Sequence, residues 1–209
     1  MISLNQAYPK NNFPDFFIIG PHRSGTTWLY KNIKEHPEII FPEQKEVHYF
    51  CEHKNLRPLV LANSPTLDNY INLFQQSHKS FLLNSLKILL RHGKSYKPLR
   101  GEATACYSVL DKDLIREIVT LNPYLKVILM IRNPIDRAWS HARHFYTKQK
   151  GIELSDVTSK ELENFFHGKY IFRAGEYTKT IDLWQNFLQP GYLFYGQFED
   201  LIKQPENLI

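Results

Sequence analysis

A run of apolar residues at positions 16–19, followed by glycines and then by a helical pattern, dominates the sequence. The run FFII is long enough for a buried strand. Gly20 and Gly25 favour a tight turn after it, and the apolar spacing from Thr26 onward predicts a helix that ends before Pro37. In such a strand–loop–helix unit the backbone N–H groups of the loop and of the helix N-terminus face one point. That point attracts an anion, most often a phosphate.

Apolar runs and helical stripes alternate along the rest of the chain. Further strands are predicted at residues 38–41, 99–102, 126–131 and 192–198, and further helices at 66–78, 80–91, 112–121, 134–145, 159–166 and 177–188. The nearly continuous apolar run at 126–131 suits the middle of a parallel sheet. Strands that alternate with helices predict an α/β fold with a mainly parallel central sheet. The length predicts a single domain over residues 1–209.

Helix-capping residues support several of these boundaries. Asp111 and Asn133 are suited to cap the helices that follow them, and Thr158 with Glu161 has the spacing of a capping box. The helix after Asn133 carries an apolar face that we expect to be buried, formed by Ala138, Trp139, Ala142 and Phe145. The helices at 66–78 and 80–91 are expected either to pack on the sheet or to form a lid.

Composition and charge narrow the classes of partner. The 209 residues are 43% hydrophobic and carry a formal net charge of +5, which favours anionic ligands. No block of lysines and arginines is present, so nucleic acid is not expected as a partner. No run approaches the length of a membrane span, and the N-terminal stretch lacks a signal-peptide core. Cys51 and Cys106 do not make a disulfide framework; they favour a reducing compartment, and a cytoplasmic location is expected.

The spacing of Gly20 and Gly25 is that of a Walker A loop, but the Walker lysine is missing. Thr26 follows Gly25 directly, and the basic residue of the loop is Arg23. A nucleoside triphosphate needs that lysine on its β- and γ-phosphates. The sequence therefore predicts a phosphate cradle without the γ-phosphate contact. A tight turn with no ligand is the alternative, because a glycine pattern alone is a weak signal.

A second anion-binding signal follows the strand at 126–131. Arg132 leaves the sheet, and Ser140 lies eight residues on, about two helical turns later. Arginine binds phosphate in a planar, bidentate manner, and serine adds a hydroxyl donor. Ligands of parallel sheets bind beyond the carboxyl ends of the strands, so the glycine loop, Glu102 and Arg132 are expected to meet in one cleft. The alternative is that Arg132 pairs with a carboxylate at the sheet edge.

Together these motifs resemble the sulfotransferases that use 3′-phosphoadenosine-5′-phosphosulfate (PAPS), above all the carbohydrate and heparan-type branch and its bacterial relatives. The segments that carry the resemblance are GPHRSGTTW, KEVHYF, IRNPIDRAWS, FRAGEYTKTIDLWQNF and LFYGQFEDLIKQPENLI. The resemblance covers roughly residues 16–209. It implies a P-loop-like three-layer sandwich, PAPS as donor substrate, and transfer of a sulfuryl group to a hydroxyl or amine. The implied acceptor is a small molecule or a carbohydrate.

The resemblance also implies roles for single residues. The segment that matches the 5′-phosphosulfate loop is formed by Arg23, Ser24, Gly25, Thr26 and Thr27, with Trp28 beside it. Arg132 and Ser140 match the pair on the 3′-phosphate. Glu46 matches the general base of the heparan-type enzymes, and His48 is the second candidate for this role.

Chemistry supports these roles, and the residues leave alternatives open. An attacking hydroxyl must lose a proton, which a carboxylate or a histidine can accept, and cations such as Arg23 stabilise charge on the leaving oxygen. Without the resemblance, Glu46 would be taken for a surface carboxylate paired with Lys45. The spacing of His48, Cys51 and His53 fits no standard zinc pattern, so no metal is expected.

Two departures from the family pattern qualify these expectations. Ala103 stands where many relatives have a lysine near the reacting groups. Relatives usually continue beyond the position of Ile209 with further helices and a basic loop that closes over the donor, so the chain is expected to bind the donor weakly. Pairing with a second copy is expected to cover the sheet face left open.

A kinase and a non-catalytic nucleotide-binding module are the rival functions, and the kinase would need a Walker lysine and a magnesium-binding acid.

Overall fold

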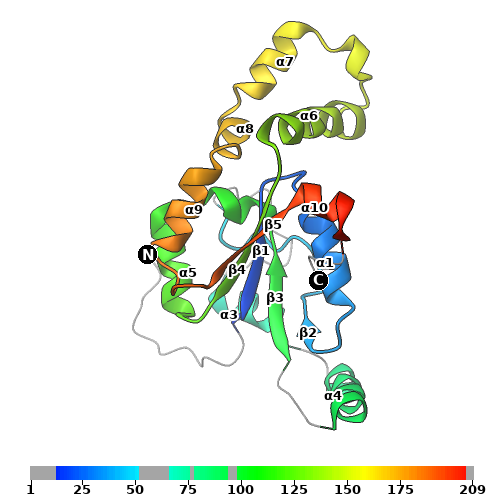
Figure 1. Cartoon of the computed structure of the whole chain (residues 1–209), viewed down its shortest axis with the longest axis vertical. Helices are drawn as coiled ribbons and strands as arrows, with labels where there is room; N and C mark the ends of the chain where they lie inside the picture. The colour runs from blue at the N-terminus through cyan, green and yellow to red at the C-terminus, as the bar shows by residue number, and fades with distance from the viewer. Residues whose placement is uncertain (1–12, 52–65, 76–77, 94–97, 206–209) are drawn as a thin grey trace.

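A five-stranded parallel sheet forms the centre of the computed structural model, which describes residues 13–51, 66–75, 78–93 and 98–205. The strand order is β2-β3-β1-β4-β5, and every neighbouring pair is parallel (Figure 1). The strands are β1 (Phe16–Ile19), β2 (Ile39–Ile40), β3 (Leu99–Ala103), β4 (Lys126–Ile131) and β5 (Leu193–Gln197). The α/β fold with a parallel sheet is confirmed.

Strand β1 lies in the middle of the sheet and divides its side chains between two cores, since successive residues of a strand point to opposite faces. Phe17 and Ile19 join the larger core, against helices α3 (Leu67–Asn72), α5 (Lys112–Leu121) and α9 (Tyr177–Gln185). Phe16 and Ile18 join the smaller core, against α1 (Thr26–Lys34) and α10 (Phe198–Lys203). Helices therefore cover both faces of the sheet, as Figure 1 shows, and the expected three-layer sandwich is confirmed.

The predicted caps are present. The carboxylate of Asp111 accepts from the N–H groups of Asp113 and Leu114 at the start of α5. Asn133 caps α6 (Pro134–His144), whose first residue is the expected proline. Thr158 and Glu161 form the complete capping box of α7 (Ser159–Phe166). Local sequence chemistry therefore determines where these helices begin.

Other elements were not predicted. The segment after β3 forms a 3₁₀ helix (Ala105–Val109), and two short helices, α8 (Lys169–Arg173) and α10, fall where no helix was expected. Further short turns of helix occur at Phe145–Gln149 and Leu154–Asp156. The buried face expected for α6 is partly wrong: Ala142 is buried, but Trp139 is 43% exposed while Arg137 is 1% exposed. The Arg137 guanidinium donates to the carbonyl of Ile171 and so joins α6 to α8.

The helices expected at 66–78 and 80–91 differ in their packing. Helix α3 contributes Leu67 and Tyr70 to the larger core. Helix α4 (His78–His92) stands apart from the sheet, beside the start of β3 (Figure 1). Leu83, Leu86 and Leu90 on this helix are exposed, whereas Ile88 is buried. Helix α4 is therefore no lid over the carboxyl ends of the strands; the side chains of Phe81 and Leu82 lie outside those described.

Candidate active site

The loop between β1 and α1 has the backbone of an anion cradle. Gly20 and Gly25 have φ angles of +147° and +97°, in the region that favours glycine. Gly25 is the N-cap of α1 and offers no side-chain hydrogen bond to it. Ser24 is fully buried, and its hydroxyl donates to the carbonyl of Pro21 at 2.7 Å, which holds the loop closed. The first N–H groups of α1 consequently face the mouth of the loop without a side-chain cap.

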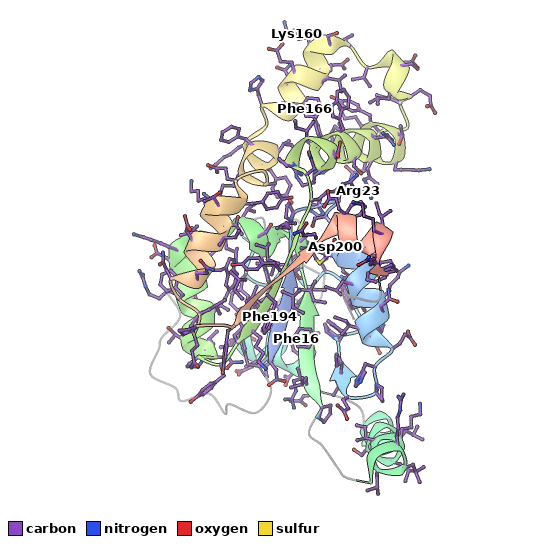
Figure 2. All side chains as sticks on the ribbon, in the orientation of Figure 1. Phe16, Arg23, Lys160, Phe166, Phe194 and Asp200 are labelled. Atoms are coloured by element: carbon purple, nitrogen blue, oxygen red, sulfur yellow. A yellow bond between two sulfur atoms is a disulfide. The ribbon has the colours of Figure 1, made fainter. Side chains whose placement is uncertain are left out.

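Arg132 and Ser140 both contact this loop through Arg23. The Arg132 Nη1 atom donates to the Arg23 carbonyl at 3.0 Å, and the Arg23 Nε atom donates to the Ser140 hydroxyl at 3.1 Å. The Arg132 guanidinium also lies 4.1 Å from the ring centre of Phe198, at the start of α10. Figure 2 shows Arg23 between α6 and α10. Two guanidinium groups and a hydroxyl thus gather beside the cradle, as the meeting of strand carboxyl ends predicts.

Glu46 lies in a second group of polar residues next to the loop. One carboxylate oxygen accepts from the Ala105 N–H at 2.9 Å and lies 3.6 Å from Nε2 of His48. The other lies 3.4 Å from Nζ of Lys45. The Lys45 ammonium in turn donates to the Thr27 hydroxyl at 3.3 Å. The pairing of Glu46 with Lys45, given above as the alternative, is therefore present. The contact with Thr27, which links Lys45 to the first turn of α1, was not predicted.

His48 adjoins the two cysteines of the chain. Its Nδ1 atom lies 3.3 Å from the Cys106 sulfur and 3.5 Å from the Cys51 sulfur, and the two sulfurs form a disulfide. The expectation of two separate thiols is therefore wrong, because the fold brings together residues that are 55 positions apart. Burial lowers the pKa of His48, with Glu46 opposing and Lys45 reinforcing that shift, so the imidazole is neutral near pH 7.

Glu102 does not reach the cleft. Its side chain is fully buried and accepts hydrogen bonds from the hydroxyls of Tyr70 and Thr104, the latter at 2.7 Å. Burial raises the pKa of Glu102 to about 7, against the effect of these hydrogen bonds. The expectation that Glu102 joins the loop and Arg132 is wrong, because its side chain points into the larger core instead of beyond the strand end. Its hydrogen bond with Tyr70 links β3 to α3.

A cavity of about 580 Å³ opens beside these groups, within the size range of small-molecule sites. Its walls are mainly apolar and include His22, His141 and Tyr170 together with both cysteines. The His22 N–H donates to the Tyr170 hydroxyl at 3.4 Å. Burial lowers the pKa of His22, and it lowers the pKa of His141 to about 4. None of these three residues was predicted from the sequence; the only signal was the position of His22 inside the glycine loop.

No helix of the described residues is both long and apolar enough to cross a membrane. His53, considered above as a metal ligand, lies outside the described part of the chain.

The fold and the site together define an α/β protein with a P-loop-like glycine loop that lacks the Walker lysine and has an arginine–serine group beside it. The match to the sulfotransferase domain family extends over residues 13–209. The chain belongs to this family.

Individual sulfotransferases are similar to this chain, which supports its membership of the family. The chain is 26% identical over 199 residues to carbohydrate sulfotransferase 15 of Mus musculus, covering 81% of this chain and 34% of the relative. It is 22% identical over 205 residues to heparan sulfate glucosamine 3-O-sulfotransferase 6 of Homo sapiens, covering 94% of this chain and 50% of the relative. The chain thus spans a third to a half of the length of these relatives.

A solved structure supports the fold independently. The sulfotransferase from Alicyclobacillus acidocaldarius superposes with a TM-score of 0.65 at 22% sequence identity, covering 93% of this chain and 77% of that one.

Proposed function

We propose that this chain transfers a sulfuryl group from PAPS to a hydroxyl or amine of an acceptor. The observation that carries this proposal is the pairing of a lysine-free phosphate loop with the group formed by Arg23, Arg132 and Ser140. PAPS differs from ATP in its 3′-phosphate and in having no γ-phosphate. A second cationic site beside the cradle could bind the 3′-phosphate, and a donor without a γ-phosphate does not need the Walker lysine.

The donor would lie along the carboxyl ends of β1 and β4. The 5′-phosphosulfate would be held by the loop and first turn of α1, formed by Arg23, Ser24, Gly25, Thr26 and Thr27, with Trp28 following. Arg132 and Ser140 would hold the 3′-phosphate. In support of this, Arg23 of the loop donates to the Ser140 hydroxyl, so the groups proposed for the two ends of the donor adjoin each other.

In the proposed reaction the acceptor oxygen or nitrogen attacks sulfur while Glu46 takes the acceptor proton. The new bond to sulfur forms as the bond between sulfur and the bridging phosphate oxygen breaks, and adenosine 3′,5′-bisphosphate leaves with that electron pair. The backbone N–H of Ala105 and the ammonium of Lys45 orient the carboxylate. Lys45 and Arg23 would stabilise charge on the leaving oxygen. His48 is neutral and 3.6 Å from Glu46, which makes it the second candidate for the base.

The acceptor is proposed to be a carbohydrate or another small molecule, because the names of the two curated relatives refer to carbohydrate and heparan sulfate acceptors. The cavity lined by His22 and Tyr170 also has Cys51 and Cys106 in its wall, and His48 contacts both cysteines. This cavity is the proposed acceptor pocket. Self-association of the chain and a cytoplasmic location stay predictions. The disulfide weighs against the second, since such bonds persist mainly in oxidising compartments.

The test is a transfer assay on the purified chain. PAPS labelled with ³⁵S is incubated with a panel of alcohols, amines and glycans, and labelled product and adenosine 3′,5′-bisphosphate are both quantified. A parallel reaction with γ-labelled ATP tests the kinase alternative. The proposal predicts sulfuryl transfer with equal release of bisphosphate and no phosphoryl transfer. Binding of bisphosphate without turnover on any acceptor would favour the non-catalytic nucleotide-binding module.

A further inference from the structure

We propose that Cys51, Cys106 and His48 form a redox-gated site for a thiophilic divalent metal ion such as Zn²⁺. The disulfide closes this site, and reduction by a dithiol opens it. The three ligand atoms lie within 4.8 Å of one another, the only such group of histidines, cysteines and acids in the described residues. Two thiolates and one imidazole are a known ligand set of zinc sites that keep a fourth position open.

The orientation of the His48 ring is the first argument for this site. Its Nδ1 atom faces both sulfurs, at 3.3 and 3.5 Å, while its Nε2 atom faces the Glu46 carboxylate at 3.6 Å. Histidines that bind metals through one nitrogen usually donate from the other to a carboxylate or carbonyl, which fixes the ring and its tautomer. Glu46 is itself held by the Ala105 N–H. The outer partner of a metal-bound histidine is therefore already in place.

Backbone conformation and access are the second argument. His48 has a φ of +58°, which a non-glycine residue adopts at some energetic cost and which is common at functional sites. Both cysteines are buried, at 3% and 6% exposure, yet both line the cavity of about 580 Å³. A metal bound there would be shielded from bulk solvent and would keep its fourth position toward the cavity, open to water or a small ligand.

Sequence spacing could not reveal this site. His48 and Cys51 lie three positions apart in the loop after β2, whereas Cys106 comes from the 3₁₀ helix after β3. Parallel pairing of β2 with β3 brings these two segments together at the carboxyl end of the sheet. His48, Cys51 and His53 are close in sequence and fit no zinc pattern, whereas Cys106 becomes a third ligand only through the fold.

Opening of the site requires one external reductant for the disulfide. A dithiol gives two electrons and two protons to the bond between Cys51 and Cys106 and becomes a disulfide itself. The two protein thiols then release two protons to solvent as Zn²⁺ binds both thiolates and the neutral imidazole of His48. Exchange with an external disulfide reverses the process: that disulfide takes two electrons, gains two protons from solvent and becomes a dithiol, while the bond between Cys51 and Cys106 re-forms. The metal is then released, because a disulfide sulfur is a poor ligand compared with a thiolate.

The first experiment measures metal content of the full chain. One portion is left as isolated, and another is reduced with tris(2-carboxyethyl)phosphine and desalted under nitrogen. In this reduction the phosphine takes oxygen from water and becomes its oxide, while the disulfide becomes two thiols. Both receive excess Zn²⁺, are desalted again, and are analysed by mass spectrometry of the metal. The proposal predicts about one zinc ion per reduced chain and less than about 0.1 per oxidised chain. Equal zinc in the two portions, or none in the reduced one, would overturn it.

Variants and a spectroscopic probe assign the ligands. Cys106→Ser and Cys51→Ser, which remove ligands from different segments, should each abolish binding, and His48→Ala should weaken it about tenfold or more. His167→Ala, at the exposed C-cap position of α7, is the matched control and should bind normally. If a cysteine variant fails to fold by circular dichroism, Co²⁺ added to the reduced wild type decides instead. Sulfur-to-cobalt charge-transfer absorption is then expected, and its absence contradicts thiolate ligation.

The site has a consequence for catalysis that rests on the proposed function. A metal on Nδ1 would fix the His48 Nε2–H as a donor to Glu46, so the carboxylate could no longer accept the acceptor proton freely. Zn²⁺ should therefore inhibit sulfuryl transfer by the reduced chain and leave the oxidised chain unaffected. Zinc that binds without inhibiting would overturn this coupling, whereas the metal analysis above decides the site itself and needs no turnover.

Discussion

Arg132, at the end of β4, donates a hydrogen bond from its guanidinium to the backbone carbonyl of Arg23 in the loop after β1, 3.0 Å away. The two residues are 109 positions apart, and parallel pairing of β1 with β4 places the ends of both strands side by side. The contact joins the loop predicted to bind the 5′-phosphosulfate to the arginine predicted to bind the 3′-phosphate. A donor with both groups could therefore be held by one continuous surface.

Replacing Arg132 should remove most of the discrimination between nucleotides. A charge-assisted hydrogen bond contributes about 1.5–3 kcal/mol, so Arg132→Ala should weaken binding of adenosine 3′,5′-bisphosphate by about tenfold to a hundredfold. Binding of adenosine 5′-monophosphate should change little, because it has no 3′-phosphate. Isothermal titration calorimetry of both ligands measures this difference. Arg143→Ala, an exposed position on α6, is the control, and a similar loss there would contradict the assignment.

Much of this site could be predicted because sheet topology determines it. The glycine loop, Arg132 and Ser140 each follow a strand whose apolar pattern is plain, and parallel strands bring their carboxyl ends together. Glu102 also lies near the carboxyl end of a strand. Successive side chains of β3 point to opposite faces of the sheet, however, and that of Glu102 points into the core. Lys45, Cys106 and Tyr170 could not be assigned from sequence. Their positions depend on how irregular segments pack, and periodicity carries no information on that.

Glu46→Gln should lower turnover by about a hundredfold, the usual contribution of a general base, and should leave donor affinity unchanged. The amide keeps an acceptor oxygen for the Ala105 N–H, so local structure should be retained. The measurement is the rate of ³⁵S transfer to a competent acceptor, with Glu43→Gln as the exposed control. Full activity of Glu46→Gln would indicate that His48, and not Glu46, is the general base.

Lys45→Met should reduce turnover by about tenfold to a hundredfold, since a cation near the leaving oxygen stabilises the transition state. The change removes the contacts with Thr27 and Glu46 while keeping an unbranched side chain that is one atom shorter. Steady-state kinetics should show the loss mainly in kcat. Lys31→Met, at an exposed position on α1, is the control. A Lys45→Met enzyme with normal kcat would show that the contact is structural only.

Glu102 should make stability depend on pH. Its pKa is raised from 4.5 to about 7 in the folded chain, so the folded state binds more protons than the unfolded state between these values. The resulting stabilisation is fully present below pH 4.5 and is lost as pH rises through 7, by about 3 kcal/mol in total. Glu102→Gln keeps hydrogen-bonding oxygen and nitrogen atoms but cannot ionise.

Denaturant unfolding at a series of pH values from 5 to 8 measures this effect as the difference between wild type and Glu102→Gln. The wild type should lose stability relative to the variant as pH rises. His141, with a pKa lowered to about 4, acts in the opposite direction below pH 6.5, but it is common to both proteins and cancels in the difference. The exposed Glu163→Gln should follow the wild type. A difference that does not vary with pH would contradict the protonation of Glu102.

The central claim is that this site recognises a nucleotide by its 3′-phosphate and not by a γ-phosphate. Calorimetric titration of the wild-type chain with adenosine 3′,5′-bisphosphate, adenosine 5′-monophosphate and ATP tests it directly. We predict that the bisphosphate binds at least about tenfold more tightly than either of the others, from one charge-assisted interaction or more. Equal affinity for the bisphosphate and ATP would contradict the claim.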